Sequence, residues 1–341
     1  MEVENLQGTV IETSDDDDGG IDPVFYELIN ALDESGVKRI EPPKKERFIA
    51  NGAEGSVYET KYNGEIYAIK VINVSKMRKL KKVYSTSKFI KSIVTYVKKQ
   101  TILAKTLSRL KREYVDFPNG IMEVGVPFYN IFDDTVYIFQ LMEMIQGDKL
   151  STIMKSGSKY IIEESVLVDY IIDLMEVLTM FENESICHRD IKPDNVVYDV
   201  ERGFVLIDFG GFCTYDRSKT VTSCKGVFAT PNYASPEYLN YIKTGRSSNV
   251  DYTKLDVYSV GIIAQLLMVG MDIDKYNSLV QYNPTTNRSD LIEWNTTFTD
   301  LIPIVRGMVD PDPNTRSSAS DVLFQLSNFN IVSPLKQKKH E

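Results

Sequence analysis

The sequence predicts an α+β protein in which a small lobe of antiparallel strands and one helical region precedes a larger, mainly helical lobe. Between residues 48 and 72, apolar and β-branched residues alternate and are separated by glycines, which is typical of strands joined by turns. From residue 163 to 184, apolar residues recur instead at helical spacing. The chain has 341 residues, 43% of them hydrophobic, so it can bury a large core.

An acidic tail and one short helix are expected in the N-terminal extension, residues 1–47. The first 22 residues contain eight acids and no Lys or Arg, a composition typical of disorder; the acids are Glu2, Glu4, Glu12, Asp15 to Asp18 and Asp22. A helix is predicted next, because Asp22 can cap it, Pro23 suits its first position and Gly36 can end it. Its apolar face comprises Phe25, Leu28, Ile29 and Leu32.

Residues 48–145 are expected to form the small lobe. Asn63-Gly64 separates two apolar runs and indicates a two-residue hairpin. A basic segment, residues 76–112, follows, and within it Ser85 to Arg112 has helical spacing. Its predicted buried face comprises Phe89, Ile93, Val97, Ile102 and Leu103. Val136 to Ile145 then returns to strand composition.

Residues 146–330 are expected to form the large lobe, with a tail at residues 331–341. A long helix is predicted from Glu163 to Glu184, with Val166, Tyr170, Ile171, Leu174 and Leu178 on one face. The most apolar run, Val260 to Met271, contains Gln265 and falls short of the roughly 18 apolar residues that a membrane span needs. We expect this run to form a buried helix, and we expect no transmembrane segment.

Cysteine usage and the N-terminus predict a cytoplasmic protein, with the nucleus as the alternative. The first ten residues have neither a basic start nor an apolar stretch, so no secretory signal is visible. Cys187, Cys213 and Cys224 cannot all pair within the chain, and no CxxC motif accompanies them. We expect all three to be reduced thiols.

The stretch HRDIKPDNVVYD, from His188 to Asp199, carries residue types suited to transfer of a phosphoryl group. Asp190 could accept a proton from a hydroxyl or orient it, Lys192 could neutralise a phosphoryl group, and Asn195 offers an oxygen ligand to Mg²⁺. A short predicted strand ends at Asp208, which offers a second oxygen ligand. A polar surface turn is the alternative explanation for the same residues.

Two weaker signals lie in the small lobe. In ANGAEGSVY, Gly52 and Gly55 would let the backbone approach a phosphate closely, and Val57 could cover a purine. Lys70 ends the strand segment YAIK in an apolar context, where an ammonium needs an anionic partner such as a phosphate. Considered alone, a glycine-rich hairpin is as often structural as functional, and a solvated lysine at the end of a strand is the favoured explanation for Lys70.

Taken together, the ordered motifs resemble the eukaryotic-type protein kinase family over roughly Phe48 to Leu326. HRDIKPDN is followed thirteen residues later by Asp208-Phe209-Gly210. ATPNYASPEY, DVYSVG and DPDPNTR then follow in the family's order. The resemblance implies that Asp256 braces the loop carrying Asp190 and that Arg316 pairs with Glu237. It also implies a bilobal kinase fold, with ATP and Mg²⁺ bound between the lobes.

The resemblance further implies the site residues and the substrate class. Lys70, Asp190, Lys192 and Asn195 would be catalytic, and Asn195 and Asp208 would bind the metal. The nucleotide site would comprise Ala50, Gly52, Gly55, Val57, Ala68, Lys70, Met142, Glu143, Met144 and Asp148, with the base bonded by main-chain groups of Glu143 and Met144. Lys192, together with Thr230 in the peptide-binding loop, is similar to Ser/Thr kinases, so protein Ser/Thr hydroxyls are the expected acceptors.

Two departures from the family pattern bear on activity. The first glycine of the phosphate loop is replaced by Ala50. No acid occurs between Glu65 and Glu113, so the helix glutamate that should pair with Lys70 is missing; Gln100 and Glu113 are the candidates for its role. A neutral partner such as Gln100 would give a weaker bond than a carboxylate and would reduce activity.

Regulation and partners follow as hypotheses. Because Arg189 precedes Asp190, a phosphorylated activation segment could neutralise it, with Thr220, Thr222 and Ser223 as candidate sites. An ordinary polar loop is the alternative. The basic segment 76–112 could bind the chain's own acidic tail, an acidic protein, an anionic membrane surface or, less favoured, nucleic acid. A solvated helix face is the favoured explanation. An inactive kinase that scaffolds an acidic partner is the rival to an active enzyme.

Overall fold

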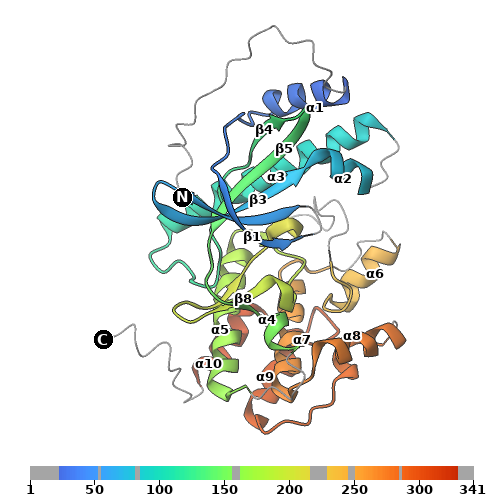
Figure 1. Ribbon diagram of the computed structural model, residues 1–341. Helices are drawn as coiled ribbons and strands as arrows, with labels where there is room; N and C mark the ends of the chain where they lie inside the picture. The colour runs from blue at the N-terminus through green and yellow to red at the C-terminus, as the bar shows by residue number, and fades with distance from the viewer. Residues whose placement is uncertain are drawn as a thin grey trace. The chain divides into compact units, whose positions relative to one another are not determined.

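The computed structural model describes residues 23–52, 55–80, 85–155, 162–215, 229–244, 250–283 and 286–328 (Figure 1). Its described residues fall into two compact units. The first comprises the residues up to Phe117 and the segment Glu123–Met144. The second comprises Pro118–Met122 and the residues from Ile145 onward. The mixed α+β class predicted from the sequence is confirmed, with an antiparallel sheet in the N-terminal part and a helical C-terminal part.

A five-stranded antiparallel sheet with the order β1-β2-β3-β5-β4 forms the centre of the first unit. The strands are β1 (Lys45–Asn51), β2 (Ser56–Tyr62), β3 (Glu65–Asn73), β4 (Phe128–Phe132) and β5 (Thr135–Glu143). Asn63 and Gly64 both have positive φ, 51° and 87°, as the two-residue turn between β2 and β3 requires. The predicted strands and the predicted hairpin are therefore confirmed.

Among the described residues of the same unit are the helices α1 (Pro23–Glu34), α2 (Val74–Leu80) and α3 (Thr86–Glu113). The hydroxyl of Ser85 caps α3 by accepting the N–H of Lys88. The predicted α3 face is wrong at Ile102, whose side chain is 51% exposed. The buried stripe continues through Gln100, Leu103, Ala104, Leu107 and Leu110 instead, because a helix of 3.6 residues per turn places position 102 on the opposite side.

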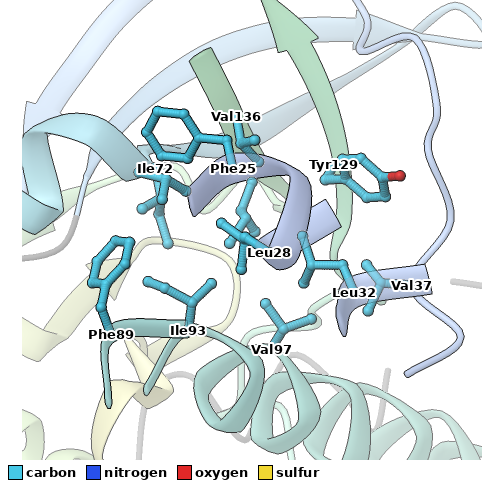
Figure 2. Packing of buried hydrophobic residues seen from close by; sticks show 12 residues of the cluster. Phe25, Leu28, Leu32, Val37, Ile72, Phe89, Ile93, Val97, Tyr129 and Val136 are labelled. Atoms are coloured by element: carbon cyan, nitrogen blue, oxygen red, sulfur yellow. The ribbon is translucent and has the colours of Figure 1, made fainter. Parts of the chain in front are cut away.

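The N-terminal helix is part of the core of the first unit. Figure 2 shows Phe25, Leu28 and Leu32 of α1 packed with residues of α3, and Ile72 of β3 and Val136 of β5 belong to the same buried cluster. Tyr129 of β4 belongs to the same buried cluster, and its hydroxyl donates to the carboxylate of Asp33 at 2.8 Å. The predicted helix is confirmed, while its expected cap, Asp22, lies outside the described residues.

The second unit is mainly helical, with short strands that shape its loops. Its helices are α4 (Leu150–Ile153), α5 (Glu164–Asn183), α6 (Pro236–Thr244), α7 (Leu255–Val269), α8 (Ile273–Tyr282), α9 (Ile302–Met308) and α10 (Ala319–Ser327). Its strands are β6 (Asp148–Lys149), β7 (Ile186–Cys187), β8 (Val196–Asp199), β9 (Gly203–Leu206) and β10 (Cys213–Thr214). The predicted helices at residues 163–184 and 260–271 correspond to α5 and α7.

Almost every residue of α7 is buried, which agrees with the predicted buried helix. Among the described helices, none is both long enough and apolar enough to span a bilayer. The expectation of three reduced cysteines is wrong for Cys213, which is disulfide-bonded, whereas Cys187 is buried and forms no disulfide. An odd number of cysteines excludes complete pairing but leaves room for one bond, and the sequence pattern alone did not reveal it.

Candidate active site

One buried carboxylate holds the backbone of the loop that carries Asp190. Asp256, in the first turn of α7, accepts the backbone N–H of His188 at 2.6 Å and that of Arg189 at 2.8 Å. Burial raises the pKa of Asp256, although these two backbone donors and His188 oppose the shift. The brace that the family resemblance implied is therefore present in this structure.

His188 is fully buried, and it packs its ring against Phe209 with the ring centroids 5.2 Å apart. Burial lowers the pKa of His188, while the nearby carboxylates of Asp256, Asp190 and Asp208 oppose that shift. Arg189 is also buried; it has a φ of 70° and donates from Nε to the carbonyl of Gly211 at 2.7 Å. His188 and Arg189 therefore stabilise the conformation of the loop that carries Asp190.

Around Asp190 the structure brings together most of the residues that the sequence singled out in this loop. Its carboxylate accepts the hydroxyl of Thr230 at 2.7 Å and the ammonium of Lys192 at 2.8 Å. Lys192 also donates to the Thr230 hydroxyl at 3.2 Å. The side chain of Asp190 keeps 21% of its surface exposed, so the carboxylate can reach a partner in solution.

Asn195 and Asp208 are brought close by the pairing of β8 with β9. Val196 pairs with Leu206, and the N–H of Ile207 donates to the carbonyl of Asn195 at 2.9 Å, so Asp208 follows directly. The Asn195 amide nitrogen donates to the backbone carbonyl of Asp190 at 2.9 Å. That bond fixes the side-chain amide of Asn195 so that its oxygen faces away from Asp190. The amide oxygen of Asn195 and the carboxylate of Asp208 are hard ligands of the kind that Mg²⁺ prefers.

The loop predicted to bind peptide accepts hydrogen bonds on three consecutive backbone carbonyl groups. The sequence did not predict these bonds. The carbonyl of Pro231 accepts from Arg288 at 3.2 Å, that of Asn232 from the hydroxyl of Tyr276 at 2.5 Å, and that of Tyr233 from the hydroxyl of Ser259 at 2.9 Å. Tyr276 and Arg288 belong to no local motif, so only their position in the fold reveals their role.

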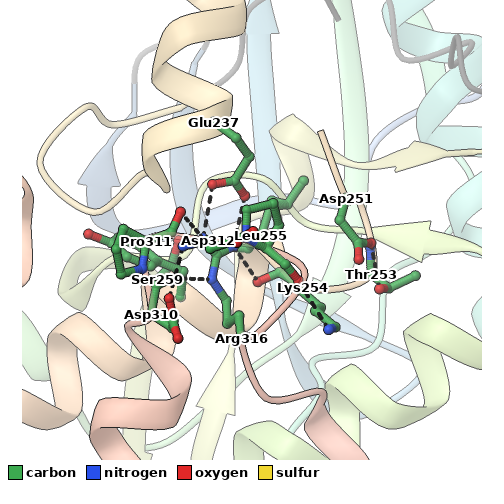
Figure 3. A network of polar contacts seen from close by, with 12 residues as sticks. Glu237, Asp251, Thr253, Lys254, Leu255, Ser259, Asp310, Pro311, Asp312 and Arg316 are labelled. Carbon is green, nitrogen blue, oxygen red and sulfur yellow. Dashed lines mark hydrogen bonds and ion pairs between the residues drawn. The ribbon is translucent and has the colours of Figure 1, made fainter. Parts of the chain in front are cut away.

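The segment after this loop is anchored by a buried ion pair. Arg316 donates to both carboxylate oxygens of Glu237, at 2.7 and 2.9 Å, and its side chain is fully buried (Figure 3). It also donates to the backbone carbonyls of Asp310 and Lys254. The pair expected from the family resemblance is therefore present, with a two-pronged geometry that lysine could not provide.

In the first unit, the glycine-rich turn joins β1 to β2. Ala50 pairs with Val57, and the N–H of Gly52 donates to the carbonyl of Gly55 at 2.7 Å. A Cβ on Gly55 would overlap the carbonyl of Val71, so this glycine lets two backbones approach closely. Residues 53 and 54 lie outside the described part of the chain.

The expected residues for the base lie on neighbouring strands. Ala68 on β3 pairs with Met142 on β5, and both are buried, so their side chains share one face of the sheet. The N–H of Glu143 donates to the carbonyl of Glu123 at 2.9 Å, which leaves the Glu143 carbonyl and Met144 as its candidate base contacts. Asp148 is exposed on β6 in the second unit.

Lys70 lies in the middle of the sheet, paired with Val57 on one side and Gln140 on the other. Its ammonium lies 5.8 Å from the ring centroid of Tyr96 on α3. Glu113 is 17 residues further along the same helix, about 25 Å away at 1.5 Å per residue, and it pairs with Arg109. Glu113 is therefore excluded as the partner of Lys70 in this structure.

Gln100, the other candidate, is buried and accepts from the amide of Gln140 at 3.4 Å. The proposed phosphorylation sites Thr220, Thr222 and Ser223 lie outside the described residues, as does the acidic run Asp15 to Asp18.

Comparison with known proteins agrees with this geometry. A model of the protein kinase domain matches residues 44–326. The chain is 27% identical over 228 residues to the serine/threonine-protein kinase chk1 of Schizosaccharomyces pombe, a match that covers 62% of this chain and 43% of that protein. It is 24% identical over 279 residues to the CBL-interacting serine/threonine-protein kinase 15 of Arabidopsis thaliana, covering 81% of this chain and 58% of that protein.

A third relative, the CBL-interacting protein kinase 10 of Oryza sativa subsp. japonica, is 26% identical over 204 residues, covering 58% of this chain and 42% of that protein. The chain thus spans about half the length of the curated relatives it matches. The family model covers most of the chain. The braced loop, the Glu237–Arg316 pair and the sheet agree with that match. The chain therefore belongs to the protein kinase domain family.

Proposed function

We propose that the protein transfers the γ-phosphoryl group of ATP to Ser and Thr hydroxyls of protein substrates. The contact of Thr230 with Asp190 and Lys192 carries this proposal. A hydroxyl that donates to the carboxylate at 2.7 Å and accepts from the ammonium is in the environment that an acceptor hydroxyl needs. The first unit would then act as the small, nucleotide-binding lobe and the second as the catalytic and peptide-binding lobe.

Each residue has a defined task in this scheme. Asp190 orients the acceptor hydroxyl and takes its proton as the oxygen attacks phosphorus. Lys192 stabilises the negative charge on the phosphoryl oxygens during transfer. Lys70 holds the phosphates of ATP, and the carbonyl of Glu143 and the main chain of Met144 bond the base.

Family membership implies ATP and Mg²⁺, and the oxygen of Asn195 and the carboxylate of Asp208 are the residues that would hold the metal. When bound, Mg²⁺ neutralises charge on the phosphate oxygens. The amide nitrogen of Asn195 is already engaged by Asp190, so an Asn195→Asp substitution would lose that bond while keeping an oxygen ligand.

A transfer assay with labelled ATP and Mg²⁺ tests the proposal, using one basic and one acidic generic protein substrate. Asp190→Asn should lower kcat by about 10²–10⁴. Asp194→Asn is the matched control, because Asp194 is exposed in the same loop, and it should keep wild-type rates. Acid hydrolysis of the product should release phosphoserine or phosphothreonine. Wild-type rates for Asp190→Asn, or phosphotyrosine as the product, would contradict the assignment.

Binding of an acidic partner is the second candidate function, and the surface of α3 favours it. Lys88, Lys91, Lys98, Lys105 and Arg112 are exposed and recur at intervals of three or seven residues, so they lie along one side of the helix. No acid occurs between Glu65 and Glu113 to balance them. The partner could be an acidic protein or the chain's own acidic tail.

Titration with polyglutamate at increasing salt tests this second function. Lys98→Glu with Lys105→Glu should weaken binding at least tenfold at low salt and flatten its salt dependence. Lys275→Glu, an exposed change in the second unit, is the control. Removal of residues 1–22 should strengthen binding if the tail occupies the helix. Equal affinity of all variants would leave α3 as a solvated surface.

A further inference from the structure

Helix α3 brings no carboxylate to Lys70. The sequence contains no Asp or Glu from Ile66 to Arg112, and the one acid of the helix, Glu113, is about 25 Å along the axis from Tyr96. The ion pair that would tie a helix to the phosphate-binding lysine therefore cannot come from α3. The register of this helix against the sheet is set by its apolar packing and by other polar contacts.

Two parallel contacts connect α3 to the sheet at this level. Lys70 and Gln140 are direct partners across β3 and β5, so their side chains leave the same face of the sheet. Tyr96 and Gln100 are four residues apart on α3, so they share one face of the helix. Lys70 meets the ring of Tyr96 at 5.8 Å, and Gln140 donates to Gln100 at 3.4 Å.

The second contact is itself anchored in the sheet. The amide of Gln140 also donates to the carbonyl of Gly125 at 2.9 Å, and Gln100 and Gln140 are both buried. A helix that slid by one turn would break both contacts at once, because the two residues on α3 are one turn apart. The pair of contacts thus defines a single register.

We propose that Tyr96 is a positioning residue that couples α3 to Lys70 through its ring face, and that the Gln100–Gln140 bond keeps the ring in place. This inference rests on the proposed function, in which Lys70 holds the phosphates of ATP. A ring attracts an ammonium through its face and does not accept its N–H groups in the way a carboxylate does. The coupling is weaker than an ion pair and less sensitive to salt.

Variants at position 96 separate the ring from the hydroxyl. Tyr96→Phe keeps the ring and should bind MgATP within about twofold of wild type, whereas Tyr96→Leu should weaken MgATP binding about two- to fivefold. Affinity is measured by calorimetry on the whole chain, and kcat by phosphoryl transfer. Ile102→Ala, at an exposed position of α3, is the control and should bind like wild type.

Lys70→Met distinguishes positioning from a general loss of structure. If Tyr96 acts through Lys70, Tyr96→Leu and Tyr96→Phe should bind MgATP equally in the Lys70→Met background. A persistent difference there, or equal affinities of the two variants in the wild-type background, would overturn the proposal.

The contact can also be tested without nucleotide. Urea unfolding of the single and double variants should show that the effects of Lys70→Met and Tyr96→Leu do not add. Additive effects would overturn the contact itself. Failure of the wild type to transfer phosphate would instead overturn the proposed function and leave this unfolding result intact.

Discussion

At the scale of single residues, the Glu237–Arg316 pair shows how much a fully buried charge depends on its partner. Arg316 is 1% exposed and donates to both oxygens of Glu237 and to backbone carbonyls. Removing one member leaves the other charge buried without its counter-ion, which costs more than the pair itself contributes. The pair itself therefore contributes little net stability, but this region folds well only when both partners are present.

Arg316→Met should lower the free energy of unfolding by about 3–5 kcal/mol, because Glu237 would stay buried and charged. Glu237→Gln combined with Arg316→Met should recover part of that loss, since no unpaired charge remains. Chemical denaturation of the two single variants and the double variant checks this. A double variant as unstable as the sum of the singles would show that the charges do not interact.

His188 makes a prediction about pH. Burial lowers its pKa in the folded protein, so the unfolded chain, with an ordinary value of about 6.5, binds more protons below that pH. The contribution of His188 to stability is present above about pH 6.5 and is lost as the pH falls below it. Denaturation between pH 5 and 8 should show this decline in the wild type.

The second histidine supplies the control for that experiment. The chain contains two histidines, His188 and His340. His188→Gln should flatten the pH dependence near pH 6, whereas His340→Gln should leave it as in the wild type. The reverse result would place the titrating group in the C-terminal tail and would contradict the role given to burial.

At the scale of elements, α1 behaves as part of the first unit, although the match to the kinase domain model begins only at residue 44. Leu28 and Leu32 are fully buried against α3 and the sheet. This packing gives α3 a second apolar support besides the strands. Since α3 carries Tyr96 and Gln100, the support bears directly on the contacts that reach Lys70 and Gln140.

Leu28→Ala should therefore destabilise the first unit by about 2–5 kcal/mol, the usual cost of removing a buried leucine. Hydrogen exchange should accelerate in α1 and in the part of α3 around Phe89 to Val97. Tyr26→Ala is the matched control on the same helix, because Tyr26 is 52% exposed and its loss should change little. Unchanged exchange in α3 would mean that α1 does not support it.

At the scale of the whole molecule, the chain enters the second unit twice. The segment Pro118–Met122 belongs to that unit, although residues on both sides of it belong to the first. Leu206 of β9 donates to the carbonyl of Gly120 at 2.8 Å, and Arg202 donates to the carbonyls of Asn119 and Ile121. Unit boundaries therefore cannot be placed by one cut in the sequence.

Gly120 of this segment packs closely against two backbone carbonyl groups. A Cβ there would lie 2.8 Å from the carbonyl oxygen of Asp173 and 3.0 Å from that of Phe204. Gly120→Ala should cost about 1–3 kcal/mol through overpacking. Gly52→Ala is the comparison, because its Cβ would meet an ordinary contact at 3.4 Å. Equal thermal stability of both variants would contradict the tight packing.

The sequence by itself determined the family, the α+β class and the residues that stand next to one another in motifs. The motifs that carry Asp190, Lys192, Asn195 and Asp208 were visible because short loops fix the spacing of these residues, and the roles given to them stay predictions. The brace by Asp256 followed from the family resemblance. Strands and helices were predictable because periods of two and 3.6 residues leave a visible apolar pattern.

Only the tertiary structure decided the contacts between distant segments. It placed Tyr96 beside Lys70 and excluded Glu113 as the partner of Lys70. It also joined Tyr276 and Arg288 to the predicted peptide-binding loop and put α1 into the core of the first unit. None of these follows from local pattern, because each depends on how elements far apart in the chain pack against one another, and packing depends on the shape of the whole core.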